Sequence, residues 1–405
     1  MTAAGETGMP ASPVLRAALT AATTDQIIYD LSGIDESHAR LRNDLPGVAV
    51  RFAIKACPVD DVLATLARGG AGFDAASPNE IAQALRTGVP ARLIHYGNTV
   101  KSDMDIAAAH RLGIRDFATD STADVRAVAA YAPGSRVFCR LATTGAGALW
   151  GLTGKMGCSV PDAVTVLETA RACGLTPSGL SLHVGSQQMS PAAWRAAFAD
   201  LAEAQTLLQR RGIHLGHVNL GGGLPALGYR DRRGRPLRAP LDRILAEIRD
   251  GVGRLRQEAG GVLGVVLEPG RHLVADHGAI RAHVVRLTAR RPRDHGRAAH
   301  WLYLSCGKFN GLYEMDQIQY PLAFPAHPAG PTVPAVIAGP TCDSDDAYAA
   351  SHPMPVPAAL TSGDPVWILA AGAYAVSYLT RGFNGFDPLP HRSVRDGLPA
   401  EAACR

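Results

Sequence analysis

Eight short apolar runs, separated by longer segments of helical spacing, constrain the fold of this chain more than any other feature. Strand-like runs rich in β-branched and other apolar residues occur at 47–54, 72–75, 93–97, 115–118, 136–141, 179–184, 215–220 and 263–268. Helix-like segments rich in Ala and Leu lie between them at 59–68, 78–88, 102–112, 121–131, 160–173, 190–211 and 239–258. Strands that alternate with helices form parallel sheets, and eight of them over about 240 residues favour the α/β class with a closed, TIM-like (β/α)8 barrel.

The pattern changes after residue 280. Prolines cluster between 321 and 357, and strand-like runs at 282–287, 301–305, 333–338 and 365–369 have no long helices between them. We therefore expect a barrel over 27–280 and a mainly β domain over 281–405, which ends in a tail from Pro388. Residues 1–26 are rich in Ala, Thr, Gly and Pro, and predict an arm that is either loosely ordered or added to the β domain.

Composition sets the outer limits on function. The 405 residues, 47% of them hydrophobic, suffice for a large core, and no apolar run approaches the ~18 residues that a membrane span needs. The N-terminus lacks the pattern of a secretion signal, and the seven cysteines show neither a Cys-x-x-Cys pair nor a zinc-like spacing. We expect a reduced, cytoplasmic protein without a metal, a membrane or a nucleic acid as partner.

The formal net charge is +4, and basic residues gather in two stretches, 230–238 and 286–297. Such stretches favour solvated loops, and attraction for an anionic partner is the alternative interpretation.

Reactive side chains fall at the ends of the predicted strands. In a parallel barrel the C-terminal ends of the strands meet at one mouth, where chemistry gathers. Following the strands in order, that mouth would hold Lys55, Asp74, His95 with Asn98, Asp120, Arg140, His183, Gly221 to Gly223, and Glu268. The sequence therefore predicts one site at this mouth.

A lysine amine and a distant carboxylate at one mouth can hold pyridoxal phosphate. Lys55 would form the Schiff base, for which burial and a nearby cation would depress the amine pKa, and Glu268 would face the pyridinium nitrogen. Each residue also has a simpler interpretation. Lys55 alone could be a surface side chain, and Glu268 could pair with Arg271 or Arg140.

Two further motifs suit the same cofactor. His183 could lie flat on a cofactor ring, with the hydroxyl of Ser186 near a phosphate, although His183 taken alone is better explained as an ordinary core histidine. The three glycines 221–223 follow a strand and let backbone N–H groups approach a phosphate, with a tight turn as the alternative. The dinucleotide-binding pattern Gly-x-Gly-x-x-Gly with its later acidic residue is absent.

Taken together, these motifs resemble those of the fold-type III pyridoxal-phosphate decarboxylases, most closely the ornithine/lysine decarboxylase branch. The resemblance is collinear from about residue 27 to residue 390. It is carried by Phe52-Ala53-Ile54-Lys55, Phe73-Asp74-Ala75-Ala76-Ser77, Tyr96-Gly97-Asn98-Thr99-Val100-Lys101, His183-Val184-Gly185-Ser186, Gly221-Gly222-Gly223, Glu268-Pro269-Gly270-Arg271, Gly339-Pro340-Thr341-Cys342-Asp343-Ser344-Asp345-Asp346, Gly372-Ala373-Tyr374 and Phe383-Asn384-Gly385-Phe386.

The resemblance implies an alanine racemase-like fold and a role for each matching residue. Lys55 would carry pyridoxal 5'-phosphate, His183 would stack on its ring, and Glu268 would hold the ring nitrogen protonated. The rest of the cofactor would be surrounded by Asp74, Arg140, Ser186, Gly221, Gly222, Gly223, Gly270, Arg271 and Tyr374.

The resemblance also implies a homodimer with active sites at the interface. Cys342 and Asp343 would reach into the partner's barrel, where the thiol would protonate the carbanion left by carbon dioxide and the carboxylate would bind the distal ammonium of a diamino acid. Asp316 is the candidate for a second carboxylate near that end, with Glu314 as its rival and solvation as the alternative for both.

Three departures from the family pattern suggest a specialised member. The chain reads Lys55-Ala56-Cys57 where Asn commonly stands third, Asn219 where Asp is usual, and no acidic residue before Gly307. We expect decarboxylation of a basic L-amino acid, ornithine, lysine or a modified relative, to its amine. The alternatives are an amino acid racemase on the same scaffold, which would need a second base opposite Lys55, and a catalytically silent regulatory homologue.

Overall fold

The computed structural model describes residues 12–291, 299–348 and 352–396, which form two compact units. The barrel unit comprises Asp35–Pro225 and Ala239–His272. The β unit comprises the described part of Met1–Ile34, Ala226–Arg238 and Leu273–Arg405. This division differs from the expected limits at 26 and 280, because residues 27–34, 226–238 and 273–280 of the expected barrel cluster with the β unit.

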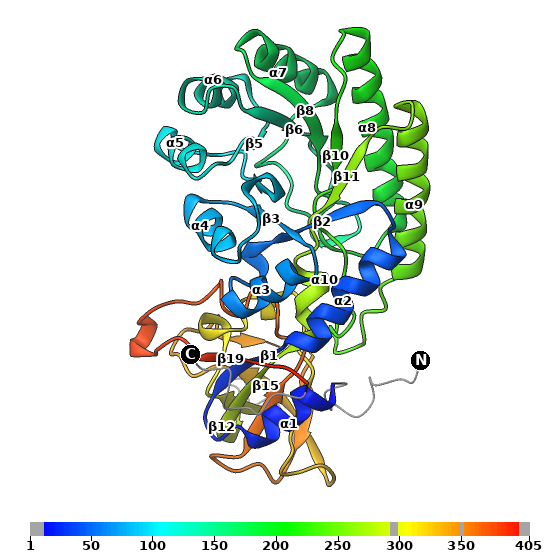
Figure 1. The fold of residues 1–405 in the computed structure, drawn as a ribbon. Helices are drawn as coiled ribbons and strands as arrows, with labels where there is room; N and C mark the ends of the chain where they lie inside the picture. The colour runs from blue at the N-terminus through cyan, green and yellow to red at the C-terminus, as the bar shows by residue number, and fades with distance from the viewer. Residues whose placement is uncertain (1–11, 292–298, 349–351, 397–405) are drawn as a thin grey trace. The chain divides into compact units, whose positions relative to one another are not determined.

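The barrel unit is built on a closed parallel barrel, which confirms the predicted fold class (Figure 1). Its eight strands follow one another around the barrel in the order β10-β11-β2-β3-β4-β5-β6-β8. Their bounds are β2 Val48–Ala53, β3 Gly72–Ala75, β4 Ile94–Tyr96, β5 Asp116–Thr119, β6 Arg136–Arg140, β8 Thr176–Ser181, β10 His217–Asn219 and β11 Gly264–Leu267. Every one of the eight predicted runs contains or overlaps one of these strands.

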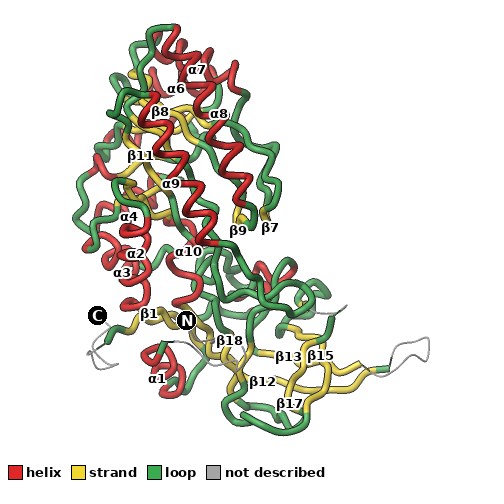
Figure 2. The backbone as a smooth tube through the Cα atoms, turned by 90° about the vertical axis from the view of Figure 1, so that its right-hand side faces the viewer, coloured by secondary structure: helices red, strands yellow, loops and turns green. Residues whose placement is uncertain are grey.

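Helices drawn in red surround the strands of the barrel (Figure 2). Seven correspond to predicted segments: α3 Asp60–Arg68, α4 Pro78–Arg86, α5 Asp103–Arg111, α6 Thr122–Tyr131, α7 Val160–Ala172, α8 Pro191–Arg210 and α9 Leu241–Glu258. The sequence analysis did not predict α2, Leu31–Asp44, or α10, Arg271–Val274. A short antiparallel pair, β7 Ala148–Trp150 and β9 Ser186–Gln188, follows strands of the barrel.

Serine caps explain where several helices begin. Ser77, Ser102 and Ser121 each accept a hydrogen bond from the amide three residues later, which satisfies one of the unpaired N–H groups of the first turn. Asp60 instead lies in the first turn of α3, where its negative charge faces the positive end of the helix dipole.

The β unit holds a nine-stranded sheet along the path β14-β18-β12-β13-β15-β16. Strand β1 pairs with β12 and β19, and β17 pairs with β15. The elements are α1 Pro13–Ala21, β1 Gln26–Asp30, β12 Gly278–Arg290, β13 Ala299–Leu304, β14 Leu322–Ala323, β15 Thr332–Ala338, β16 Ala347–Tyr348, β17 Met354–Pro357, β18 Pro365–Ile368 and β19 His391–Val394. The four strand-like runs expected here are all strands.

Both chain ends contribute to the β unit. Helix α1 buries Leu15 and Leu19 in a cluster with Ile28, Trp367 and Val394. The expected tail is corrected in part, because residues 391–394 form β19, which pairs in parallel with β1. Residues 1–11 and 397–405 lie outside the described part of the chain.

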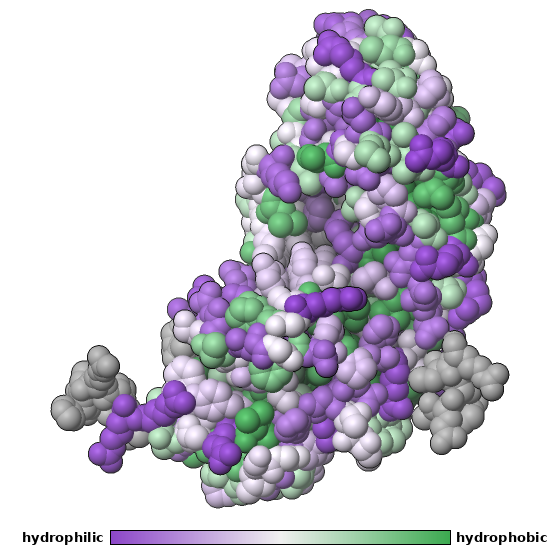
Figure 3. Space-filling view, turned by 90° about the vertical axis from the view of Figure 1, so that its left-hand side faces the viewer, coloured by the Kyte–Doolittle hydropathy of each residue, from purple (hydrophilic) through white to green (hydrophobic). Residues whose placement is uncertain are grey.

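Within the described residues, no helix is long and apolar enough to cross a membrane. The face drawn in Figure 3 mixes hydrophobic and hydrophilic side chains. The six cysteines of the described chain are all free thiols: Cys57, Cys139, Cys158, Cys173, Cys306 and Cys342.

Candidate active site

Lys55 and Asp74 form the first pair at the mouth of the barrel. Lys55 lies in a single 3-10 turn directly after β2, and its Nζ is 3.3 Å from Oδ2 of Asp74 on β3. The carboxylate is buried, whereas 48% of the lysine side chain is exposed. Burial alone would raise the pKa of Asp74, but Lys55 and His95 outweigh it and lower this pKa well below its usual range. Asp74 is therefore an anion that holds the amine.

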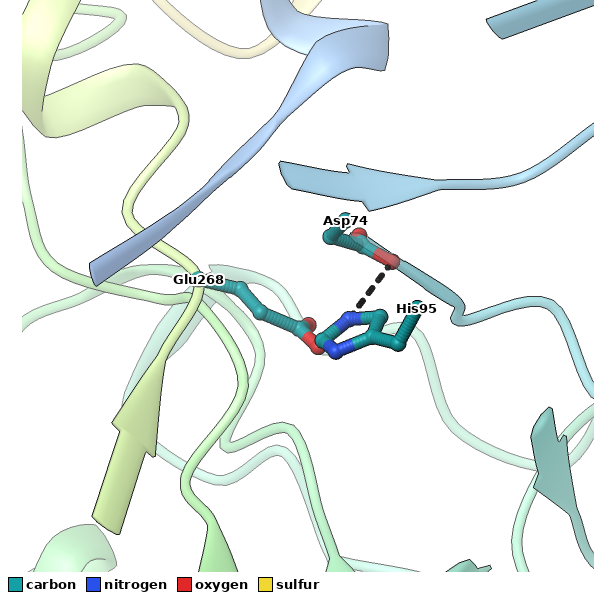
Figure 4. A group of neighbouring side chains, drawn as sticks. All are labelled: Asp74, His95 and Glu268. Carbon is teal, nitrogen blue, oxygen red and sulfur yellow. Dashed lines mark hydrogen bonds and ion pairs between the residues drawn. The ribbon is translucent and has the colours of Figure 1, made fainter. Parts of the chain in front are cut away.

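His95 joins Asp74 to Glu268 (Figure 4). Neighbouring strands place Asp74 beside His95 in register, and Glu268 directly follows β11. The His95 Nε2 lies 3.2 Å from Oδ1 of Asp74 and 2.8 Å from Oε1 of Glu268. Burial and Arg51 lower the pKa of His95, but its bonds to the two carboxylates prevail and raise it. The imidazole is thus a hydrogen-bonded bridge between the carboxylates.

The same three side chains could offer ligands to a metal ion, since their donor atoms lie within 4.8 Å of one another. Positive charge is already supplied there by Lys55 beside Asp74, and by Arg51, whose Nη1 is 2.7 Å from Nδ1 of His95. A divalent cation would be repelled by both groups. The arrangement therefore favours a hydrogen-bonded network over a metal centre.

Asn219 fixes the orientation of Glu268. Its Oδ1 accepts the backbone N–H of Gly221 at 2.9 Å, which turns its Nδ2 toward Oε1 of Glu268 at 2.5 Å. An aspartate at this position would instead place two carboxylates in contact. Asn219, which stands where the family usually has Asp, thus supplies a hydrogen-bond donor to Glu268, the carboxylate that is expected to face a cofactor ring.

His183 supplies a neutral imidazole. The N–H of Gly185 donates to its Nδ1 at 3.1 Å, so that nitrogen carries no proton. Burial, together with the positive charges of Arg140 and Lys55, lowers the pKa of His183 to about 3. An uncharged ring at this position is suited to lie against the face of an aromatic cofactor.

Arg271 and Ser186 form a separate, cationic end of the site. The buried guanidinium lies 3.3 Å from Oγ of Ser186 through Nε and 3.2 Å through Nη2. Its Cζ lies 4.5 Å from the ring centroid of Trp150, which pairs with Ser186 across β7 and β9. The sequence analysis missed Trp150, whose only signal is an aromatic residue in a glycine-rich stretch.

The glycine loop closes tightly on the neighbouring backbone. Gly221 and Gly223 have positive φ angles of 63° and 111°. A Cβ on Gly223 would lie 2.6 Å from the carbonyl oxygen of Gly185, and one on Gly222, which lies beside His183, would be 2.8 Å from the carbonyl oxygen of Glu268. Only glycine allows this approach, so the loop forms a narrow cradle beside His183. Gly270 likewise lies close to the side chains of Ala53 and Ala56.

These residues fit pyridoxal phosphate. The barrel mouth offers an amine, a carboxylate for the ring nitrogen, a neutral ring for stacking, and a guanidinium with a hydroxyl and a glycine cradle for the phosphate. When bound, this cofactor supplies an electron sink for the electron pair left on Cα of an amino acid. Arg51, His95 and Asn219 complete the network, although sequence reasoning gave none of them such a role.

The remaining predicted site residues lie in the β unit. Cys342 and Asp343 are both exposed, and the Cys342 N–H donates to Oδ1 of Asn384 at 2.9 Å. Asp316 is exposed, whereas its rival Glu314 is buried. Tyr374 has a positive φ of 65° and stacks on Tyr378 with ring centroids 5.2 Å apart. The roles given to these residues remain predictions.

Comparisons with known proteins identify the family of this chain. The family model described as pyridoxal-dependent decarboxylase, pyridoxal binding domain, matches residues 31–275. The lysine/ornithine decarboxylase of Selenomonas ruminantium is 30% identical over 363 residues, which cover 90% of this chain and 88% of that protein.

Two solved structures share the whole fold. The lysine/ornithine decarboxylase of Vibrio vulnificus complexed with putrescine has a TM-score of 0.80 and 27% identity, over 95% of this chain and 99% of that one. SrLDC in complex with PLP and cadaverine also has a TM-score of 0.80 and 27% identity, over 93% and 92% of the two chains. This chain therefore belongs to the fold-type III pyridoxal-phosphate-dependent decarboxylases, and its cofactor is pyridoxal 5'-phosphate.

Proposed function

We propose that the protein decarboxylates a basic L-amino acid, ornithine, lysine or a modified relative, to the corresponding amine and carbon dioxide. The observation that carries the proposal is the meeting of Lys55 and Glu268 with the Asp74–His95 pair at one barrel mouth. The relatives named lysine/ornithine decarboxylase, and the structures complexed with putrescine and cadaverine, support a basic substrate.

Each barrel residue has one task in this proposal. Lys55 would hold the cofactor through its amine and would lie close to Cα of the bound substrate. His183 covers one face of the ring without adding charge, because its pKa is lowered to about 3. Arg271 and Ser186 bind the phosphate, and Glu268 keeps a proton on the ring nitrogen.

The β unit would complete the site from the partner subunit of a homodimer. When the bond between Cα and the carboxylate breaks, carbon dioxide leaves and the electron pair remains on Cα. The Cys342 thiol would give its proton to Cα, and the resulting thiolate would then take a proton from water. Asp343, with Asp316 as a second carboxylate, would bind the distal ammonium. The exposure of these three side chains supports a role at such an interface.

We further propose that the protein works in the cytoplasm. The free thiols of the described chain, Cys342 among them, are consistent with a reducing compartment.

Carbon dioxide release from a panel of L-amino acids tests the substrate. We expect the largest kcat/KM for ornithine or lysine, and values at least about 100-fold lower for norleucine, which lacks the distal charge that Asp343 would pair with. A preference for norleucine or for meso-diaminopimelate would contradict the proposal. Loss of optical activity without carbon dioxide release would identify the racemase alternative instead.

A further inference from the structure

Polar side chains continue from Glu268 into the interior of the barrel unit. His95 contacts Glu268, and Arg51 on β2 donates from Nη1 to Nδ1 of His95 at 2.7 Å. Nη2 of Arg51 lies 3.9 Å from Oδ2 of Asp116 on β5. Arg136 on β6 then donates to both oxygens of Asp116, at 2.6 and 2.8 Å. We call Glu268, His95, Arg51, Asp116 and Arg136 the polar column.

The polar column is largely buried. The side chains of His95, Asp116 and Arg51 are 2%, 8% and 15% exposed. Gly72, the register partner of Arg51, leaves room for it, because a Cβ there would lie 3.2 Å from Cγ of Arg51. Burying such groups costs several kcal/mol per ion unless each is paired, and apolar side chains would usually stabilise a core at least as well. A role beyond stability is therefore expected for the polar column.

The contacts of His95 determine which of its nitrogens carries the proton. The two carboxylates raise the pKa of His95, but Arg51 can only donate, and its 2.7 Å contact therefore requires an Nδ1 that accepts and carries no proton. Nε2 must then carry the proton and donate it to Glu268 and Asp74. The ring of Phe138, 5.3 Å away between centroids, packs against this imidazole. Asp116 and Arg136 in turn fix Arg51, so the direction of the His95 donor is set by the whole polar column.

Both donors of Glu268 reach the same oxygen. Nε2 of His95 and Nδ2 of Asn219 both lie within hydrogen-bond distance of Oε1. Oε2 has no hydrogen bond to another side chain in the described residues, so it keeps its capacity to accept one from a ligand. The two donors on Oε1 fix the way in which the Glu268 carboxylate is turned.

We propose that His95 is a positioning residue, which holds the Glu268 carboxylate turned so that it keeps the proton on the cofactor ring nitrogen. The inference rests on the cofactor role of this site and does not depend on which amino acid is decarboxylated. Without the imidazole, Asp74 and Glu268 would face each other with oxygens less than 4.8 Å apart and no donor between them. Their repulsion would turn the Glu268 carboxylate away and weaken its hold on the proton of the ring nitrogen.

Nitrogen-15 NMR of protein loaded with ring-labelled pyridoxal phosphate tests this proposal at neutral pH. In His95→Leu we expect the ratio of nitrogen-bound to carboxylate-bound proton to fall about 10- to 100-fold, since one hydrogen bond to a charged group is lost. His95→Gln carries an amide N–H near the place of Nε2 and should restore most of the ratio. His217→Leu, which removes another imidazole packed on Phe138, should leave it unchanged.

A second measurement needs no cofactor. In the protein without pyridoxal phosphate, 15N-labelled His95 should show a protonated Nε2 and an unprotonated Nδ1. In Arg51→Met, Nδ1 should gain a proton near neutral pH, because the guanidinium that lowers the pKa of His95 is gone. This arm remains informative if His95→Leu does not fold.

A proton on Nδ1 rather than Nε2 in the parent protein would overturn the proposal. So would an unchanged ring-nitrogen signal in a folded, cofactor-loaded His95→Leu variant. If the ring signal behaves as expected but no basic amino acid is decarboxylated, only the proposed substrate fails.

Discussion

The two units of this protein hold their functional side chains in different ways. In the barrel unit each predicted residue is fixed by neighbours of the same chain, as Asp74 is by Lys55 and His95. In the β unit Cys342 and Asp343 are exposed; the N–H of Cys342 donates to Asn384, and the Asp343 carboxylate accepts from the N–H of Asp345 in its own turn. The barrel site is therefore preorganised, whereas the two reactive side chains of the β unit face solvent.

The difference between the two units predicts which activity depends on which unit. Cofactor binding should depend on the barrel unit, while proton delivery to the substrate and choice of side chain should depend on the β unit. Substitutions in one unit should leave the functions of the other intact, and the first three predictions below test that separation.

The largest effect is expected for Lys55→Ala. Without this amine no covalent link to the cofactor can form, so carbon dioxide release should fall about 10⁴-fold. Borohydride reduction followed by peptide mass spectrometry should find the cofactor on Lys55 in the parent and on no residue of the variant. Lys155→Ala, at an exposed lysine of the same unit, should behave as the parent. Labelling at another lysine would break the assignment of the barrel site.

Cys342→Ala should lower kcat about 10³-fold, because the proton donor to Cα is removed. The absorbance of the bound cofactor and its affinity for the protein should stay as in the parent. A larger share of the product should carry the new proton at an atom other than Cα. Cys173→Ala, at another exposed thiol, is the matched control. An unchanged rate with Cys342→Ala would mean that the β unit supplies no acid.

Asp343→Asn should raise KM for ornithine and lysine about 10- to 100-fold, with a smaller change in kcat, because a charged hydrogen bond to the distal ammonium is lost. Asp345→Asn, whose carboxylate is 78% exposed in the same turn, should change KM little. Equal effects of the two variants would remove the assignment of Asp343 as the substrate carboxylate. Mixed dimers, in which one subunit carries Asp343→Asn and the other Lys55→Ala, would show by steady-state kinetics whether Asp343 acts across an interface.

The smallest effect concerns acid stability. Burial lowers the pKa of His217 to about 4, so unfolded chains bind a proton below about pH 6.5 while the native barrel unit does not. The free energy of unfolding should therefore fall as the pH drops from 6.5 toward 4. In His217→Leu the loss between pH 7 and pH 4.5 should be smaller by about 2 kcal/mol, measured by urea denaturation. His214→Leu, at an exposed histidine nearby, should keep the parent's pH dependence.

The barrel could be predicted because its signals are local. Each strand is an apolar run, each helix has its own spacing, and serine caps such as Ser77 mark several starts. The reactive residues were found because parallel strands carry their ends to one mouth. None of this needs knowledge of which strands are neighbours.

The polar column could not be predicted, because its contacts join residues that are far apart in the sequence. Arg51 and Asp116 each look like an isolated polar residue in or beside an apolar run, and only the order of strands around the barrel brings them together. Strand β19 was missed because His391-Arg392-Ser393-Val394 has little strand character of its own. It forms a strand by pairing with β1, which is far away in the sequence. Helix α2 was missed because polar residues dominate its sequence.

The pairing of β1 with β19 also bears on how the chain matures during its synthesis. Translation proceeds from the N-terminus, so every residue of the barrel unit leaves the ribosome before His391–Val394 is made. Until then β1 lacks one of its two neighbours and exposes an open sheet edge. The catalytic scaffold can thus assemble while translation continues, whereas the β sheet becomes complete only when residues 391–394 emerge.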